Sequence, residues 1–260
     1  MSGMSDDQVP EPQPPPRVTP FDAPVPTGGD PPNAPGIVNA LVIGVTLTNA
    51  GVIAYAFDPA RAGQSAMLGS MAAFYAALSA LALYRLHRRG ELIRRFRPAR
   101  GDITLAAVTA GVLYGAAHIV ASLFAAPGSP RELWVVRLYL QLGDPDAPGR
   151  SLVGVAVFCV AALEEIVWRG LVMRSIQDVA GPWRAVALST ALYAAVHLPT
   201  LVSLRAPGAG YNPLVLLAAL GCGLVWGLMV LRTGRLVPAI LAHALFSWSI
   251  IEFPLWQPRP

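Results

Sequence analysis

Two adjacent carboxylates and an arginine lie inside an otherwise mostly apolar stretch, residues 151–173. They are Glu164, Glu165 and Arg169. A stretch of this length can span a bilayer. Ionisable groups at that depth are costly, so we expect them to be paired, to face a cavity and to serve a function. The sequence therefore predicts a polar site within a membrane helix.

Helical geometry gives the two glutamates different surroundings. Glu165 lies four residues before Arg169, so the two can form an ion pair on one helix face. Glu164 points about 100° away and is expected to remain largely unpaired, so it can act as a base. A purely structural intramembrane salt bridge is the alternative, but it leaves Glu164 without a role.

Two histidines are expected to lie near this pair. His197 is in the predicted span 186–201 and His243 is in the span 237–253. At 1.5 Å per residue, His197 lies about 16 Å, His243 about 10 Å and Glu164 about 13 Å from the predicted cytoplasmic ends of their spans. Three proton-active groups on three helices thus share one level, in the inner half of the bilayer, as a hydrated active site requires.

Three other polar side chains within spans are expected to be structural. His118 follows Tyr114 with the spacing that also separates Tyr193 and His197, but it has no acidic companion. Asn39 and Asn49 are expected to form hydrogen bonds between helices.

Composition predicts an all-α, polytopic transmembrane bundle. The chain has 260 residues, of which 54% are hydrophobic and 13% charged. About seven spans are expected, and the polar segment between the third and fourth can hold a short interfacial helix at 133–142. The seven predicted spans are 37–57, 66–84, 103–124, 151–173, 186–201, 213–231 and 237–253.

The arginines predict the orientation of the bundle. All 19 basic residues are arginine, and they are densest at 85–100, which we interpret as a cytoplasmic loop in contact with anionic headgroups. The N-terminus is then cytoplasmic. A net charge of +4 that is concentrated in this loop does not indicate nucleic-acid binding. Cys159 and Cys222 lie in apolar spans and are expected to be unpaired.

Three regions follow along the chain. Residues 1–35 are a disordered, Pro-rich tail, and Asp6 and Asp7 stand where a secretory signal would carry positive charge. The run Pro14-Pro15-Pro16 can dock a partner, but a passive extension is preferred. Residues 36–125 hold the first spans and the basic loop. Residues 150–253 hold the glutamates and the two histidines.

The order of these motifs resembles the CPBP family, the CAAX-protease and bacteriocin-processing intramembrane glutamic endopeptidases, which include the Ras-converting prenyl endopeptidase. The motifs are Glu164-Glu165-x-x-x-Arg169, Tyr193-x-x-x-His197 and His243-x-x-x-Ser247, and the segment 221–243 is also similar. The chain departs from the family at Tyr193, where phenylalanine is usual and the change looks harmless. It also departs at Ser247, where asparagine is usual and an amide donor is lost.

The resemblance implies hydrolysis of a peptide bond in a membrane-anchored protein or peptide, within the cytoplasmic membrane of a bacterium. Glu164, assisted by His197, would activate water, while His243 and Ser247 would stabilise the oxyanion. Glu165 and Arg169 would support the helix. No covalent intermediate, cofactor or metal is implied.

Three alternatives remain open. Glutamate and two histidines can bind a metal as a facial triad, although the His-x-x-x-His turn of zincins is missing. A non-catalytic immunity or scaffold protein could have kept the fold, as Ser247 would allow. A transporter is the third alternative, without paired repeats to support it.

Overall fold

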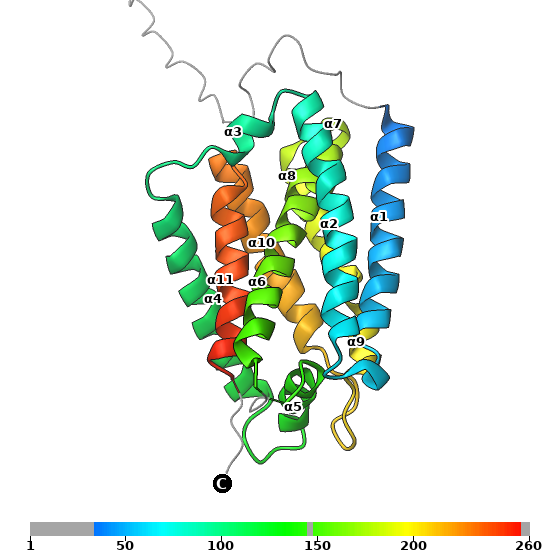
Figure 1. Ribbon diagram of the computed structural model, residues 1–260, viewed down its shortest axis with the longest axis vertical. Helices are drawn as coiled ribbons and strands as arrows, with labels where there is room; N and C mark the ends of the chain where they lie inside the picture. Colours follow the sequence, from blue (N-terminus) through cyan, green and yellow to red (C-terminus); the bar gives the residue numbers. More distant parts are fainter. Residues whose placement is uncertain (1–33, 145–147, 256–260) are drawn as a thin grey trace, which may run out of the picture.

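The computed structural model describes residues 34–144 and 148–255. It is an elongated bundle whose long helices lie roughly along one axis, with a short helix near each end (Figure 1). We name the two ends after α3 (Leu92–Phe96) and α5 (Glu132–Gln141). The described residues contain no strand, only an isolated bridge between Ala206 and Gly210, so the all-α prediction is confirmed. Residues 1–33 of the predicted tail lie outside the described ranges.

Six helical stretches are long and apolar enough to cross a membrane. Four are single helices: α1 (Pro35–Ala56), α2 (Ser65–Arg88), α4 (Asp102–Phe124) and α10 (Leu214–Thr233). The fifth stretch joins α6 (Arg150–Glu165), the π-helical segment η2 (Ile166–Met173) and α7 (Arg174–Ala180). The sixth contains α8 (Pro182–Ala195) and α9 (Leu198–Ser203). A shorter apolar helix, α11 (Val237–Glu252), completes the seven predicted segments.

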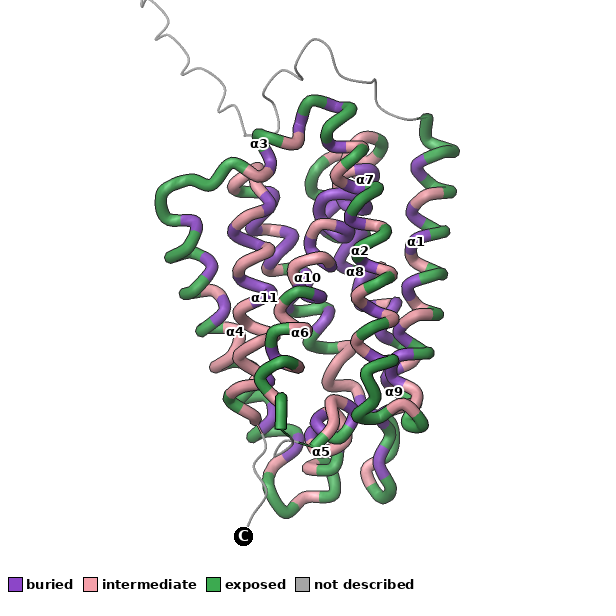
Figure 2. The backbone as a smooth tube through the Cα atoms, in the orientation of Figure 1, coloured by how far each residue is buried: buried purple, intermediate pink, exposed green. Residues whose placement is uncertain are grey.

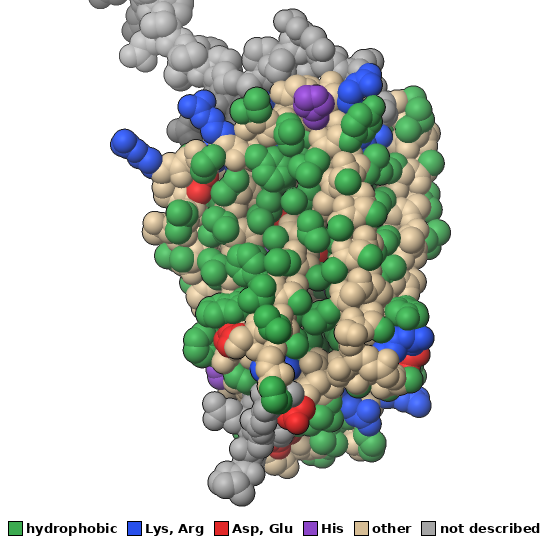
Figure 3. All heavy atoms as spheres, viewed as in Figure 1, with side chains coloured by type: hydrophobic (Ala, Val, Ile, Leu, Met, Phe, Trp, Pro, Cys, Tyr) green, Lys and Arg blue, Asp and Glu red, His purple; other side chains and the backbone are tan. Residues whose placement is uncertain are grey.

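The outward faces of these helices are apolar. Ile103 and Leu123 on α4 expose 74% and 72% of their surfaces. Buried residues face the interior while exposed ones line the outside (Figure 2). Hydrophobic side chains cover the middle of the visible face, and arginines lie near its two ends (Figure 3). Apolar surface of this extent is suited to lipid, so the protein is an integral membrane protein.

Close helix packing determines where the polar residues meet. Helix α11 packs against both α6 and α4, while α2 packs against α6 and η2. Gly154 of α6 faces α11, where the Glu252 carboxylate and the Trp248 ring lie closest to it. Asn49 of α1 donates a hydrogen bond to the Tyr75 hydroxyl of α2 at 2.9 Å, which confirms its predicted role. The predicted interfacial helix is α5, and its Tyr139 hydroxyl donates to the Ile250 carbonyl at the end of α11.

The arginine-rich segment differs from its prediction as a loop against headgroups. Arg89 and Arg95 are buried, and so is Glu91 between them. Glu91 accepts from Arg174 of α7 at 2.6 Å and from Arg95 at 3.2 Å. Arg89 pairs with Asp178 of α7 at 2.7 Å. Burial favours the neutral acid, but the guanidinium groups of Arg174 and Arg95 outweigh it and lower the pKa of Glu91 to about 2. The segment therefore joins α2 and α3 to α7.

Candidate active site

The two glutamates are the last residues of α6, and both are buried. The Arg169 Nη1 donates to Glu165 Oε1 at 3.0 Å, so the predicted ion pair is confirmed. The helix does not continue as a regular α-helix, because residues from Ile166 to Met173 are π-helical. π-Helical turns are rare and occur often at functional sites. Arg169 lies within this wider turn.

Arg169 is fixed from α10 as well as from its own helix. Its Nη2 donates to the Gly223 carbonyl at 2.7 Å. Its guanidinium also lies 5.1 Å from the ring centre of Tyr193 and 5.6 Å from that of Trp226. Gly223 has no side chain to obstruct this contact, since a Cβ there would lie 3.4 Å from Arg169 Nη2. The charge of Glu165 is thereby balanced by a cation that is itself held in place.

His243 connects the two glutamates. Its Nδ1 lies 2.9 Å from Glu165 Oε1, and because a carboxylate only accepts, Nδ1 carries the proton. Its Nε2 lies 3.7 Å from Glu164 Oε2. The imidazole also stacks on Trp226, with ring centres 3.7 Å apart and planes 20° apart. Glu165 thus orients His243 in addition to binding Arg169, a second contact that the sequence did not predict.

His197 lies at a break between helices. The sequence placed it inside one span, but the structure has a turn at Val196 and His197, between α8 and α9. Pro199 follows two residues later, and a proline restricts the helical hydrogen bonds before it. The Nδ1 of His197 lies 2.8 Å from the Tyr193 carbonyl, so this nitrogen is the donor and Nε2 is left for proton exchange.

Tyr193 contacts Glu164 directly. Its hydroxyl donates to Glu164 Oε2 at 3.1 Å. The sequence had predicted a largely unpaired carboxylate, whereas the structure gives it this hydrogen-bond partner. The tyrosine ring packs edge-on against Trp168 and His197, with centres 5.3 Å and 5.0 Å away. The change from phenylalanine to tyrosine therefore places a new donor beside the predicted base.

One cavity, of about 190 Å³, brings the predicted residues together. Glu164, His197, His243 and Ser247 all line it, and so does Tyr193. Its apolar wall comes largely from the end of α1, the start of α2, the end of α5 and one face of α6. The apolar lining residues are Phe57, Met67, Leu68, Met71, Leu142, Val157, Val160 and Ala161. The cavity thus extends from the carboxylate toward the α5 end.

Comparison with known families supports the predicted resemblance. A family model described as type II CAAX prenyl endopeptidase Rce1-like matches residues 148–249. This segment is Rce1-like. It begins just before α6 and ends within α11, so it contains the polar residues described above and most of the cavity wall from α6. No curated protein and no solved structure gives a significant match.

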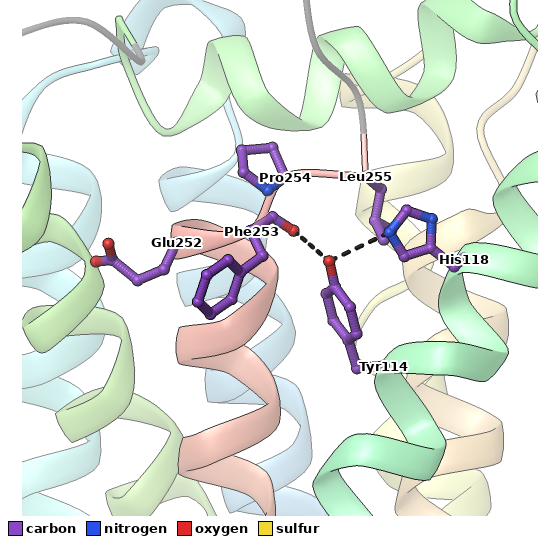
Figure 4. Close-up of a pocket in the computed structure, with 6 residues that line it drawn as sticks. All are labelled: Tyr114, His118, Glu252, Phe253, Pro254 and Leu255. Carbon is purple, nitrogen blue, oxygen red and sulfur yellow. Dashed lines mark hydrogen bonds between the residues drawn. The ribbon is translucent and has the colours of Figure 1, made fainter.

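His118 lies on α4, outside the Rce1-like segment and outside the cavity. Its Nε2 lies 3.2 Å from the Tyr114 hydroxyl, which donates to the Phe253 carbonyl at 2.8 Å. Figure 4 shows this contact in a separate pocket near the end of α11, with the Glu252 carboxylate directed away from it. The sequence predicted a structural role for His118 but not this contact with Tyr114, and the structural role stays a prediction.

The geometry also bears on the metal-triad alternative. Among residues 34–144 and 148–255, no group of three or more His, Cys, Asp or Glu side chains is arranged to hold a metal ion. Instead, Glu165 occupies the Nδ1 of His243 through a hydrogen bond. Tyr193 occupies the Oε2 of Glu164 in the same way. A metal would have to displace these contacts.

Proposed function

We propose that this protein is an intramembrane endopeptidase that hydrolyses a peptide bond of a membrane-associated protein or peptide. The observation that supports it best is the convergence of Glu164, His197, His243 and Ser247 on one largely apolar cavity. Buried polar groups are expensive within a membrane protein, so their convergence requires a chemical reason. The Rce1-like match at residues 148–249 supports the reaction class.

Water activation is assigned to Glu164 and His197. Glu164 removes a proton from a water molecule in the cavity, and the resulting hydroxide attacks the carbonyl carbon of the substrate. His197 assists through Nε2, because its Nδ1 proton is occupied by the Tyr193 carbonyl. The proton held by Glu164 then passes to the leaving amine. No bond forms between the enzyme and the substrate.

Oxyanion stabilisation is assigned to His243, with Ser247 one helical turn further on. Since the Nδ1 proton of His243 faces Glu165, donation from Nε2 requires the imidazolium form. Arg169 keeps Glu165 from turning away, so the Glu165 carboxylate stays beside the imidazole. Glu165 and Arg169 therefore act on the reaction by orienting and polarising His243.

The test uses purified full-length protein in liposomes and a library of internally quenched peptides, each made with and without a lipid anchor. Glu164→Gln should abolish cleavage, because an amide cannot accept the proton. Glu165→Gln should lower both the folded yield and turnover, since it weakens the contacts to Arg169 and His243. Glu132→Gln on α5 is the matched control and should retain wild-type turnover. A library with no Glu164-dependent cleavage would contradict the proposal.

Metal dependence is tested on the same preparation. If Glu164 and the histidines activate water unaided, dialysis against a strong chelator should leave the rate of peptide cleavage unchanged. The metal that remains bound to the dialysed protein is measured in parallel. Activity that disappears with the chelator and returns with zinc alone would assign the cavity to a metalloprotease.

A further inference from the structure

The hydroxyl of Tyr193 has a contact that packing alone does not require. The ring lies among Trp168, His197 and Trp226, with centres 5.0 to 6.3 Å away. A phenylalanine ring could fill the same space. Burying a hydroxyl costs free energy unless it forms a hydrogen bond. Tyr193 is 3% exposed, and its hydroxyl donates to Glu164 Oε2 at 3.1 Å, so its hydrogen bond is made to the proposed base.

The hydroxyl also reaches the space where the substrate would react. Tyr193 lines the cavity together with Glu164, His243 and Ser247. Its ring centre is 6.5 Å from that of His243, and the two planes are nearly perpendicular. A phenolic oxygen stands farther from its backbone than a serine oxygen does, so it can supply a donor where the short Ser247 side chain falls short.

We propose that Tyr193 is a catalytic donor that orients Glu164 before the reaction and then stabilises the oxyanion beside His243. This inference rests on the function proposed above. In the resting protein the carboxylate of Glu164 is the acceptor. When Glu164 takes the proton of water, it loses its charge and becomes a weaker acceptor.

The redirection of the hydroxyl follows the movement of charge. As the water oxygen bonds to the carbonyl carbon, the π electrons of the carbonyl group move to its oxygen. Negative charge thereby passes from Glu164 to the substrate oxygen. The Tyr193 hydroxyl turns to this stronger acceptor and keeps its own proton throughout. A donor aimed at developing charge stabilises the transition state more than the bound substrate, so its loss acts on kcat.

The experiment combines two substitutions and uses the quenched peptide cleaved best by the wild-type protein. Tyr193→Phe should lower kcat by roughly a hundredfold, with KM changed less than about twofold. Ser247→Asn in this background should recover at least about tenfold of that loss, because an asparagine amide supplies the missing donor. Ser247→Asn alone is measured beside the double variant, so that the recovery is the difference that the same substitution makes in the two backgrounds. Tyr114→Phe removes a hydroxyl outside the cavity and should leave kcat unchanged.

Two further arms keep the result interpretable. All variants are compared at the same folded fraction, measured by thermal unfolding in detergent. 3-Fluorotyrosine at position 193 retains the ring and a stronger hydroxyl donor, so it should retain or raise kcat. Tyr193→Phe with wild-type kcat, or a loss that Ser247→Asn does not rescue, would overturn the inference. Cleavage by Glu164→Gln at the wild-type rate would instead overturn the proposed function.

Discussion

Glu165 shows why neighbouring residues of one type have different environments. Its Oε1 contacts both Arg169, at 3.0 Å, and His243, at 2.9 Å. Glu164 instead meets Tyr193 and borders the cavity. One oxygen of the first carboxylate is thus held by two fixed groups, while the second carboxylate lines a cavity. A difference of one position along the helix determines which of the two carboxylates lines the cavity.

His243 and Ser247 should differ strongly in their contribution to the rate. His243→Ala removes a group held by Glu165 and stacked on Trp226, so cleavage should become nearly undetectable. Ser247→Ala should cost less than about tenfold, because the short hydroxyl contributes weakly to the oxyanion when Tyr193 is present. Initial rates of the quenched-peptide assay, normalised to folded protein, measure both losses. Equal inactivity of the two variants would show that Ser247 is essential.

Residue spacing predicted local contacts better than contacts between helices. The pairing of Glu165 with Arg169 follows from a separation of four, and the structure has it. The bond from Tyr193 to Glu164 joins residues 29 positions apart, and it depends on how two helices lie together. No periodicity within either helix contains that information. The only available signal was the hydroxyl itself, in a segment where a polar group needs a partner.

At the scale of the helix, α10 contributes to the site through a glycine, Gly223, that leaves room for Tyr193 and Arg169. A Cβ on Gly223 would lie 3.0 Å from Tyr193 Cδ1, whereas Gly221 has nothing within 4 Å. Gly223→Ala should therefore destabilise the protein by about 1–3 kcal/mol and also reduce turnover by displacing Tyr193 and Arg169. Gly221→Ala is the matched control and should change neither. Unfolding midpoints in detergent and peptide cleavage are the measurements. Similar behaviour of the two variants would contradict this account of the packing.

The spans were predicted well, but their irregularities were not. Apolar length and composition indicated the seven segments, because burial in lipid constrains both. The π-helical segment η2 was missed because a run of apolar residues looks the same whether the helix is α-helical or has one residue more per turn. The break at His197 had a signal, Pro199, although a proline can also be accommodated within a continuous membrane helix. Both irregularities lie beside the candidate site.

For the whole molecule, the ion pairs at the α3 end join α7 to the segment between α2 and α3. Burial opposes ionisation of Glu91, but Arg174 and Arg95 lower its pKa to about 2, below the usual value near 4.5. A depressed carboxyl pKa stabilises the folded state fully above about pH 4.5, and this stability is lost as the pH falls toward 2.

Glu91→Gln should therefore lower the unfolding temperature at pH 6, and the difference from wild type should shrink at pH 3. Over this range the Glu91 carboxyl is protonated in the unfolded chain, where its pKa is near 4.5, while it stays largely ionised in the folded protein. The folded state therefore loses part of its electrostatic advantage, and the two proteins converge. Thermal unfolding in detergent at a series of pH values is the measurement. A difference that stays constant from pH 6 to pH 3 would mean that the charge of Glu91 does not contribute.

The orientation of the cavity is a separate prediction for the whole molecule. The arginine distribution predicts a cytoplasmic α3 end, yet the cavity extends from Glu164 toward the α5 end. The cavity would then open away from the cytoplasm. The depths estimated from the sequence had instead placed the site in the cytoplasmic half of the bilayer. In a background with Cys159→Ala and Cys222→Ala, Pro207→Cys should react with an impermeant maleimide on intact cells. Ala99→Cys should react only after permeabilisation, and the reverse pattern would invert the topology.

The π-helical segment also affects which changes of chain length the protein can tolerate. Deleting one residue from an α-helix turns everything beyond it by about 100°, so a lipid-facing side would rotate inward. A π-helical turn already contains one residue more than an α-helical turn. Deleting that one residue can convert the turn to a regular α-helical turn without rotating the residues beyond it. A deletion between Gly170 and Met173 would keep the spacing of Glu165 and Arg169 and leave α7 directed toward Glu91. Within this span, we therefore expect length variation among descendants of the chain to concentrate there.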